Sequence, residues 1–184
     1  MTETAQQGIH VLVVVDMQND FIDGALGTPE AVAMLPRAEA RIREFDGTVF
    51  FTRDTHPESY LMTQEGRNLP VRHCIRGTQG WQLAPAIGAL CKERRAHIFD
   101  KPSFGSPALA EALSRLHWRS PIADVTIIGL CTDICVVSNA LIIKAALPEV
   151  PIIVDAACCA GVTPEKHAAA LETMRSCQVK VIND

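Results

Sequence analysis

One segment sets the architecture that the rest of this chain has to fit, Val125-Thr-Ile-Ile-Gly-Leu-Cys-Thr-Asp-Ile-Cys-Val136. Its β-branched beginning predicts a buried strand, and Gly129 ends that strand. Residues 136–147 form an apolar, alanine-containing segment that is long enough for a helix. Thr132 or Asp133 would be its N-cap. A strand followed directly by a helix is the repeating unit of parallel α/β sheets.

The position of Cys135 within this segment suits a nucleophile. Cys135 falls in the first turn of the expected helix, where free backbone N–H groups and the helix dipole favour a thiolate over a thiol. Because the thiolate is the nucleophilic form, Cys135 is the first candidate for covalent catalysis. The other six cysteines can simply be small apolar residues of the core: Cys74, Cys91, Cys131, Cys158, Cys159 and Cys177.

Two charged residues occupy equivalent places at the ends of other expected strands. The apolar run 11–15 ends in Asp16. The apolar run 96–99 is followed by Asp100 and Lys101, and Pro102 disfavours a helix at Lys101. In an open parallel sheet, ligands bind at the carboxyl ends of the strands, near the switch point of the topology. We therefore expect Asp16, Lys101 and Cys135 to converge on one pocket.

Strand and helix signals alternate along the whole chain. The expected strands are 10–15, 48–52, 96–99, 125–128, 152–154 and 179–182, and the expected helices are 29–45, 82–91, 108–116, 133–147 and 163–176. This alternation predicts an α/β fold, a three-layer, doubly wound parallel sheet of the Rossmann-like type with helices on both faces. We expect a single domain over residues 1–184, because no repeat or linker divides the sequence.

A second group of polar residues lies in the long segment 53–80, which the sequence predicts to be a functional loop. Asp54 and His56 are two residues apart, so both face the same way in an extended segment. Glu65 and His73 follow, and together these four side chains suit zinc, iron(II) or manganese. Helix caps and hydrogen bonds in a solvated loop are the alternative interpretation.

Three motifs of this chain resemble those of the isochorismatase-like cysteine hydrolases. They are Asp16-Met-Gln-Asn-Asp-Phe21, Lys101-Pro-Ser-Phe104 and Gly129-Leu-Cys-Thr-Asp-Ile-Cys-Val136, and they occur in the family's order. The resemblance implies a triad with Asp16 as proton acceptor and donor, Lys101 as electrostatic partner and Cys135 as nucleophile. It also implies a cis peptide bond between Leu130 and Cys131, which turns the backbone N–H groups of Cys131 and Cys135 toward one oxyanion.

The activity that this resemblance implies is hydrolysis of a small carboxamide through a thioester on the cysteine, first of all nicotinamide to nicotinate and ammonia. Asp54, His56 and His73 match the family's divalent-metal ligands, and Glu65 matches more loosely. Zinc is the first expectation, with iron or manganese as alternatives, and the metal would hold the pyridine nitrogen of the substrate. Phe21 would flank the flat ring.

Two alternatives remain open at this level. Amidases for ureidoacrylate, N-carbamoylsarcosine or maleamate use the same triad, and Leu69 stands where some nicotinamide-hydrolysing members have an aromatic residue, so the pocket could suit another substrate. A non-catalytic redox sensor could use Cys135 together with Cys131. Asp16 and Lys101 would have no role in such a sensor.

Composition and the remaining residues limit the partners and the location that we expect for this protein. A net charge of −4 without a basic cluster argues against nucleic acid as a partner. No apolar stretch reaches the roughly 18 residues that span a bilayer, and the polar start 1–8 is unlike a signal peptide, so we expect a cytoplasmic protein without membrane contact. The seven cysteines form no disulfide framework. His10, His97, His117 and His167 are expected to be structural or on the surface, and the resemblance implies a homo-oligomer, dimer or tetramer.

Overall fold

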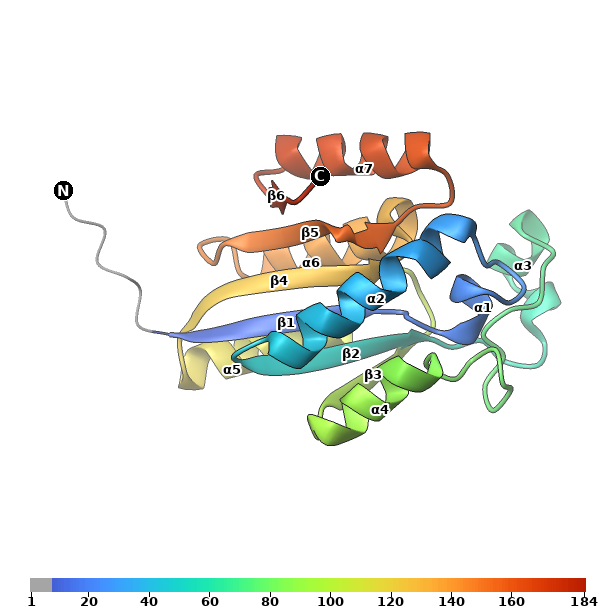
Figure 1. Cartoon of the computed structure of the whole chain (residues 1–184), viewed down its shortest axis with the longest axis horizontal. Coiled ribbons are helices and arrows are strands. Elements are labelled where there is room, and N and C mark those ends of the chain that lie inside the picture. Colours follow the sequence, from blue (N-terminus) through green and yellow to red (C-terminus); the bar gives the residue numbers. More distant parts are fainter. Residues whose placement is uncertain (1–7) are drawn as a thin grey trace.

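Six parallel strands form one sheet in the computed structural model, which describes residues 8–184 (Figure 1). The order across the sheet is β3-β2-β1-β4-β5-β6. The strands are β1 (Ile9–Val15), β2 (Thr48–Asp54), β3 (His97–Lys101), β4 (Ile122–Leu130), β5 (Ile152–Ala160) and β6 (Lys180–Ile182). The winding direction reverses between β1 and β4, so the switch point of the topology lies between these two central strands.

The two central strands are β-branched because both of their faces are covered. Residues 11–15 of β1 are fully buried, and Val13 lies beside Ile127 of β4 in the parallel register. A strand buried on both faces reads as a continuous apolar run rather than as an alternation. The runs at 11–15 and 125–128 are of that kind.

Helices cover both faces of the sheet. Helices α2 (Pro29–Glu44) and α4 (Pro85–Glu93) pack on the face that carries Leu12 and Val14. Helices α5 (Pro107–Arg119), α6 (Val137–Ala146) and α7 (Pro164–Ser176) bury apolar residues with Val11 and Val13 of the opposite face. Figure 1 shows α2 and α4 in front of the sheet and α6 behind it. The predicted three-layer, doubly wound fold is confirmed.

The segment 53–80 is more ordered than the predicted loop. It contains a 3₁₀ turn, η1 (Tyr60–Met62), and a short helix, α3 (Gln64–Asn68), whose cap Thr63 accepts the N–H of Gly66 through Oγ1 at 3.0 Å. A further short helix, α1 (Asn19–Ile22), follows β1. Elements of this length span about one turn, which is too little for hydrophobic periodicity to reveal them.

The start of the helix after β4 was predicted wrongly. Residues Thr132–Val136 form a π-helical turn before α6, and neither Thr132 nor Asp133 caps the helix. The strand also continues through Gly129 to Leu130. Gly129 has φ +121°, and a Cβ at this position would lie 2.0 Å from the carbonyl oxygen of Val15, so only glycine fits.

The expected end of the fifth strand was also too early. Cys158 and Cys159 are buried within β5 rather than in the connection after it. Among residues 8–184, no helix combines the length and the apolar content that a bilayer crossing requires. The expectation for the N-terminal segment concerns residues 1–7, which lie outside the described part of the chain.

Candidate active site

The three predicted triad residues meet at the carboxyl edge of the sheet. Asp16 follows β1, Lys101 ends β3, and Cys135 lies in the π-helical turn after β4. The Nζ atom of Lys101 is 2.6 Å from Oδ2 of Asp16 and 3.5 Å from Sγ of Cys135. All three residues are at most 3% exposed. The ammonium group therefore bridges the carboxylate and the thiol, and all three side chains are buried.

Asp16 is held by a residue that sequence reasoning missed. The hydroxyl of Thr52, at the end of the neighbouring strand β2, donates to Oδ1 of Asp16 at 2.6 Å. Asp16 itself has φ +47°, a left-handed conformation that is uncommon for a residue with a side chain. A polar residue closing the apolar run 49–51 was the only signal for Thr52 in the sequence. Its hydrogen bond fixes the carboxylate toward Lys101.

The surroundings of Cys135 disfavour the thiolate that the sequence predicts. Burial and the nearby carboxylate of Asp16 raise the pKa of the Cys135 thiol well above its usual value, and Lys101 offsets this in part. Burial alone would lower the pKa of Lys101, but Asp16 and Cys135 together raise it. Burial is the largest of these effects on Cys135, so desolvation disfavours the thiolate that the helix start alone would predict.

The turn that carries Cys135 is held from both sides. The carbonyl of Cys131 accepts the N–H groups of Ile134 at 3.1 Å and Val136 at 3.0 Å. The peptide bond between Leu130 and Cys131 is cis, as predicted. On the other side, the hydroxyl of Thr132 lies 2.8 Å from Nδ1 of His167 in α7. His167 therefore supports the nucleophile's turn, a role that its position in the sequence did not suggest.

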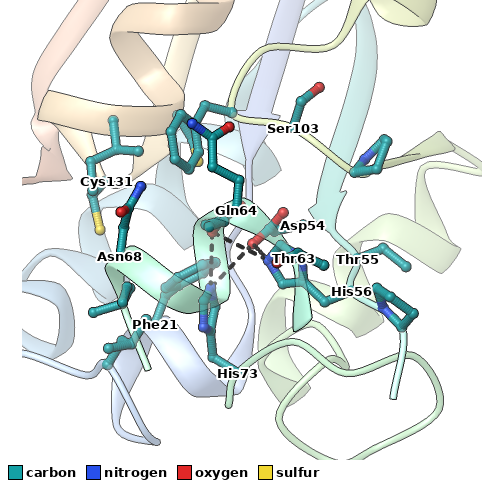
Figure 2. Close-up of a pocket in the computed structure, with 18 residues that line it drawn as sticks. Phe21, Asp54, Thr55, His56, Thr63, Gln64, Asn68, His73, Ser103 and Cys131 are labelled. Carbon is teal, nitrogen blue, oxygen red and sulfur yellow. Dashed lines mark hydrogen bonds and ion pairs between the residues drawn. The ribbon is translucent and has the colours of Figure 1, made fainter. Parts of the chain in front are cut away.

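The four predicted metal ligands form a second cluster beside the triad. Oδ2 of Asp54 lies 2.8 Å from Nε2 of His56 and 3.5 Å from Nε2 of His73. Oε1 of Glu65, on α3, lies 3.6 Å and 3.8 Å from the same two nitrogens. One ligand atom from each residue lies within 4.8 Å of all the others. Figure 2 shows Asp54, His56 and His73 facing one another at one side of the cavity.

The chemistry of this donor set fits a divalent cation. His73 has Nδ1 2.8 Å from the carbonyl of Val71, so Nδ1 donates to that carbonyl and Nε2 is the ring nitrogen that could bind a cation in the cluster. Oδ1 of Asp54 is buried without a hydrogen-bond donor, and Glu65 adds a second carboxylate to the same small space. Two imidazoles and two carboxylates are ligands that zinc, iron and manganese accept.

Asp20, from the first motif, supports this cluster through the main chain. Its Oδ2 atom accepts the N–H of Cys74 at 2.7 Å, directly after His73. Cys74 has φ +47°, and the residue is fully buried. The hydrogen bond therefore helps to hold the His73 loop in its unusual backbone conformation. Asp20 belongs to the first motif, but no local pattern in the sequence indicates this role.

A cavity of about 740 Å³ opens above both groups. Its walls include the nucleophile, the metal-ligand cluster, apolar side chains and several neutral polar ones: Phe21, Leu26, Asp54, Thr55, His56, Pro57, Thr63, Gln64, Glu65, Asn68, Leu69, His73, Pro102, Ser103, Phe104, Cys131, Ile134 and Cys135. Phe21 lies in this wall. Pockets of this size bind small organic molecules.

This chain is similar to known proteins over almost its whole length. The family model described as the isochorismatase domain matches residues 10–183. A nicotinamidase/pyrazinamidase from Mycobacterium tuberculosis is 26% identical, covering 95% of this chain and 98% of that protein. The structure of a pyrazinamidase from Pyrococcus horikoshii in complex with zinc is 29% identical with a TM-score of 0.74, covering 95% of this chain and 99% of that one. A nicotinamidase/pyrazinamidase structure from Bacillus subtilis is 27% identical with a TM-score of 0.79, covering 95% and 100%.

Proposed function

Since the chain belongs to the isochorismatase family, we propose that it cleaves nicotinamide to nicotinate and ammonia through a thioester on Cys135. The chain is a hydrolase that acts on amide C–N bonds. One observation carries the finer proposal: Lys101 lies 2.6 Å from Asp16 and 3.5 Å from Cys135, and Cys135 lines a cavity sized for a small molecule.

The triad can perform each proton transfer that amide hydrolysis needs. The carboxylate of Asp16 takes the thiol proton of Cys135, and the sulfur attacks the carbonyl carbon of the amide. Asp16 then gives that proton to the nitrogen, the C–N bond breaks and ammonia leaves. Water, deprotonated by Asp16, next attacks the thioester and releases the carboxylic acid. The Lys101 ammonium stabilises the negative charge on Asp16 and on the sulfur throughout.

The tetrahedral intermediates of both steps carry an oxyanion that needs hydrogen-bond donors. We assign this role to the backbone N–H groups of Cys131 and Cys135, as the family resemblance implies. Both residues line the cavity, on the wall from which the nucleophile attacks. In other enzymes, the loss of one such donor lowers the rate by roughly 100-fold to 1,000-fold.

Asp54, His56, Glu65 and His73 would hold the divalent metal, and zinc is the proposed ion because the P. horikoshii relative was solved with zinc. When bound, the cation would supply a Lewis acid that anchors the ring nitrogen of the substrate. Phe21, which lines the cavity near His73, can then stack against the ring. These residues orient the carboxamide toward Cys135.

The alternatives are less well supported by the cavity. Ureidoacrylate, N-carbamoylsarcosine and maleamate each carry a carboxylate, yet no arginine or lysine is among the residues that line the cavity within the described chain. A redox sensor needs an accessible cysteine of low pKa, whereas Cys135 is 3% exposed and its pKa is raised by burial. A neutral carboxamide therefore remains the better substrate.

The test of this function is ammonia release from nicotinamide by the zinc-loaded protein. We expect turnover that disappears in Cys135→Ala, while Cys177→Ala, a change at the exposed cysteine, keeps it. Acid quenching during turnover followed by mass spectrometry should show a nicotinoyl adduct on the peptide that contains Cys135. Absence of ammonia from the folded, metal-loaded wild type would refute the nicotinamidase assignment, and turnover in Cys135→Ala would refute the thioester.

Three further predictions concern the whole protein. We propose that residues 1–184 act as one catalytic domain, since all six strands belong to one sheet. Assembly into a dimer or tetramer and a cytoplasmic location stay predictions from the sequence. Light scattering on the purified protein measures the oligomeric state, and fractionation of the source cells measures the location.

A further inference from the structure

Helix α3 brings two side-chain amides to the cavity that neither the triad nor the metal ligands account for. Gln64 and Asn68 are four residues apart, so they project from the same face of the helix. Both are exposed to solvent at the rim of the cavity that they line, and neither side chain makes a hydrogen bond to another residue of the described chain 8–184. In Figure 2, the amide of Asn68 points toward Cys131, and the amide of Gln64 points away from His56 and His73.

The helix that carries these amides is fixed in place. Oγ1 of Thr63 accepts the N–H of Gly66 at 3.0 Å, and the hydroxyl of Tyr60 donates to the carbonyl of Leu69 at 2.9 Å. Gly66 packs so tightly against η1 that a Cβ there would lie 2.1 Å from the carbonyl oxygen of Tyr60. Hydrogen-bonding groups on an anchored element bind with less loss of conformational freedom than groups on a loose loop.

The surroundings of the two amides define what they can recognise. Phe21, Leu69, Phe104 and Ile134 supply apolar walls, and the lining residues include no arginine or lysine. In a pocket of this kind, a few polar groups decide which ligand fits. A side-chain amide both donates and accepts, so it pairs with a neutral group such as a hydroxyl or a second amide.

We propose that Gln64 and Asn68 form a hydrogen-bonding subsite that selects neutral carboxamides carrying a second polar group on the part of the molecule remote from the metal ligands. This inference rests on the amidase function proposed above. It names the substrate class more narrowly than a bare pyridine carboxamide. It also gives α3 two tasks, because Oε1 of Glu65 on the same helix lies 3.6 Å from Nε2 of His56 and 3.8 Å from Nε2 of His73 in the metal-ligand cluster.

The test compares two ring-substituted nicotinamides that carry either a hydroxyl or the similarly sized methyl group at the same carbon. For the wild type we expect kcat/KM to be about five-fold to ten-fold higher for the hydroxyl compound at the favoured ring position, the effect of one or two net hydrogen bonds. Gln64→Leu and Asn68→Leu should each reduce this preference, and the double variant should abolish it. Gln82→Leu, an exposed glutamine outside the cavity, should leave it unchanged.

A binding measurement separates this subsite from the chemistry. Calorimetry with Cys135→Ala, alone and combined with Gln64→Leu and Asn68→Leu, reports the same preference as a ratio of dissociation constants without turnover. Equal constants for the hydroxyl and methyl compounds at every ring position would overturn the subsite even if nicotinamide is hydrolysed. A retained preference that disappears with the two leucines would support the subsite even if the wild type released no ammonia.

Discussion

The side-chain amide of Gln18 and the main chain of Asp54 exchange two hydrogen bonds. Nε2 of Gln18 donates to the carbonyl of Asp54 at 2.8 Å, and Oε1 of Gln18 accepts the N–H of Asp54 at 2.7 Å. Asp54 in turn lies between the two functional groups, with Oδ1 3.8 Å from Lys101 and Oδ2 2.8 Å from His56. Gln18 therefore fixes the residue that joins the triad to the metal-ligand cluster.

Replacement of Gln18 by leucine should destabilise the protein and weaken metal binding together. Gln18 is fully buried, and Gln18→Leu leaves the N–H and carbonyl of Asp54 and the carbonyl of Trp81 without these partners. An unsatisfied buried group costs about 1–3 kcal/mol, so we expect the free energy of unfolding to fall by roughly 3 kcal/mol or more. Urea unfolding and zinc titration measure the two effects. Gln82→Leu, at an exposed glutamine, is the control. Equal stability of the two variants would contradict the role of Gln18 in holding Asp54.

The burial of Asp16 should be visible in the pH dependence of activity. Burial raises the pKa of Asp16, and Lys101 counteracts this in part. Asp16 must be a carboxylate to take the thiol proton, so kcat/KM should fall with decreasing pH at values above the usual aspartate pKa of about 3.9. Lys101→Met removes the charge that lowers the pKa, so its acid limb should lie higher still. Profiles of kcat/KM against pH, recorded at saturating metal, test this prediction. A wild-type acid limb at or below the usual aspartate pKa would disprove it.

The triad could be predicted because its positions follow from strand ends alone. Asp16 comes directly after one apolar run and Lys101 two residues after another, and the carboxyl ends of parallel strands share one edge of the sheet. The protonation of Cys135 could not be predicted in the same way. Its pKa depends on how deeply the fold buries the thiol and on a carboxylate far away in the sequence, and neither appears in a local pattern.

The support around the site was also hidden from the sequence. Thr52 and His167 act through side-chain hydrogen bonds to residues 36 and 35 positions away, Asp16 and Thr132. Helix α3 has five residues, so no periodic pattern distinguishes it from a loop. Long-range side-chain contacts and one-turn helices are settled by tertiary packing, whereas long strands and helices are visible in the pattern of apolar residues.

Metal removal should lower stability as well as activity. Ligands that bind only the folded state stabilise it, by about 2.7 kcal/mol when the free metal is at 100 times its dissociation constant. A chelator should therefore lower the melting temperature, and added zinc should restore it. His73→Ala should bind less zinc, and its melting temperature should not change with the chelator. His97→Ala, an exposed histidine at the edge strand β3, is the matched control, and equal zinc content in both variants would argue against the cluster.

Two glycine-to-alanine substitutions should shift stability in opposite directions. Gly129 has φ +121°, and an added Cβ would lie 2.0 Å from the carbonyl of Val15, so Gly129→Ala has to displace the central strand. Gly88 lies inside α4 with φ in the ordinary helical range, and an added Cβ would meet nothing closer than 3.8 Å. Gly88→Ala should therefore raise the free energy of unfolding by about 0.5–1 kcal/mol, as in other helix interiors.

For Gly129→Ala we expect a loss of about 4 kcal/mol, because backbone strain and a main-chain collision add together. Any fraction that still folds should also hydrolyse its substrate more slowly, since Val15 is the residue before Asp16 and a displaced strand end moves the carboxylate away from Lys101. Urea unfolding followed by circular dichroism gives the stabilities, and kcat/KM of the folded fraction gives the second effect. A Gly129→Ala protein as stable as the wild type would show that the switch point between β1 and β4 tolerates a side chain.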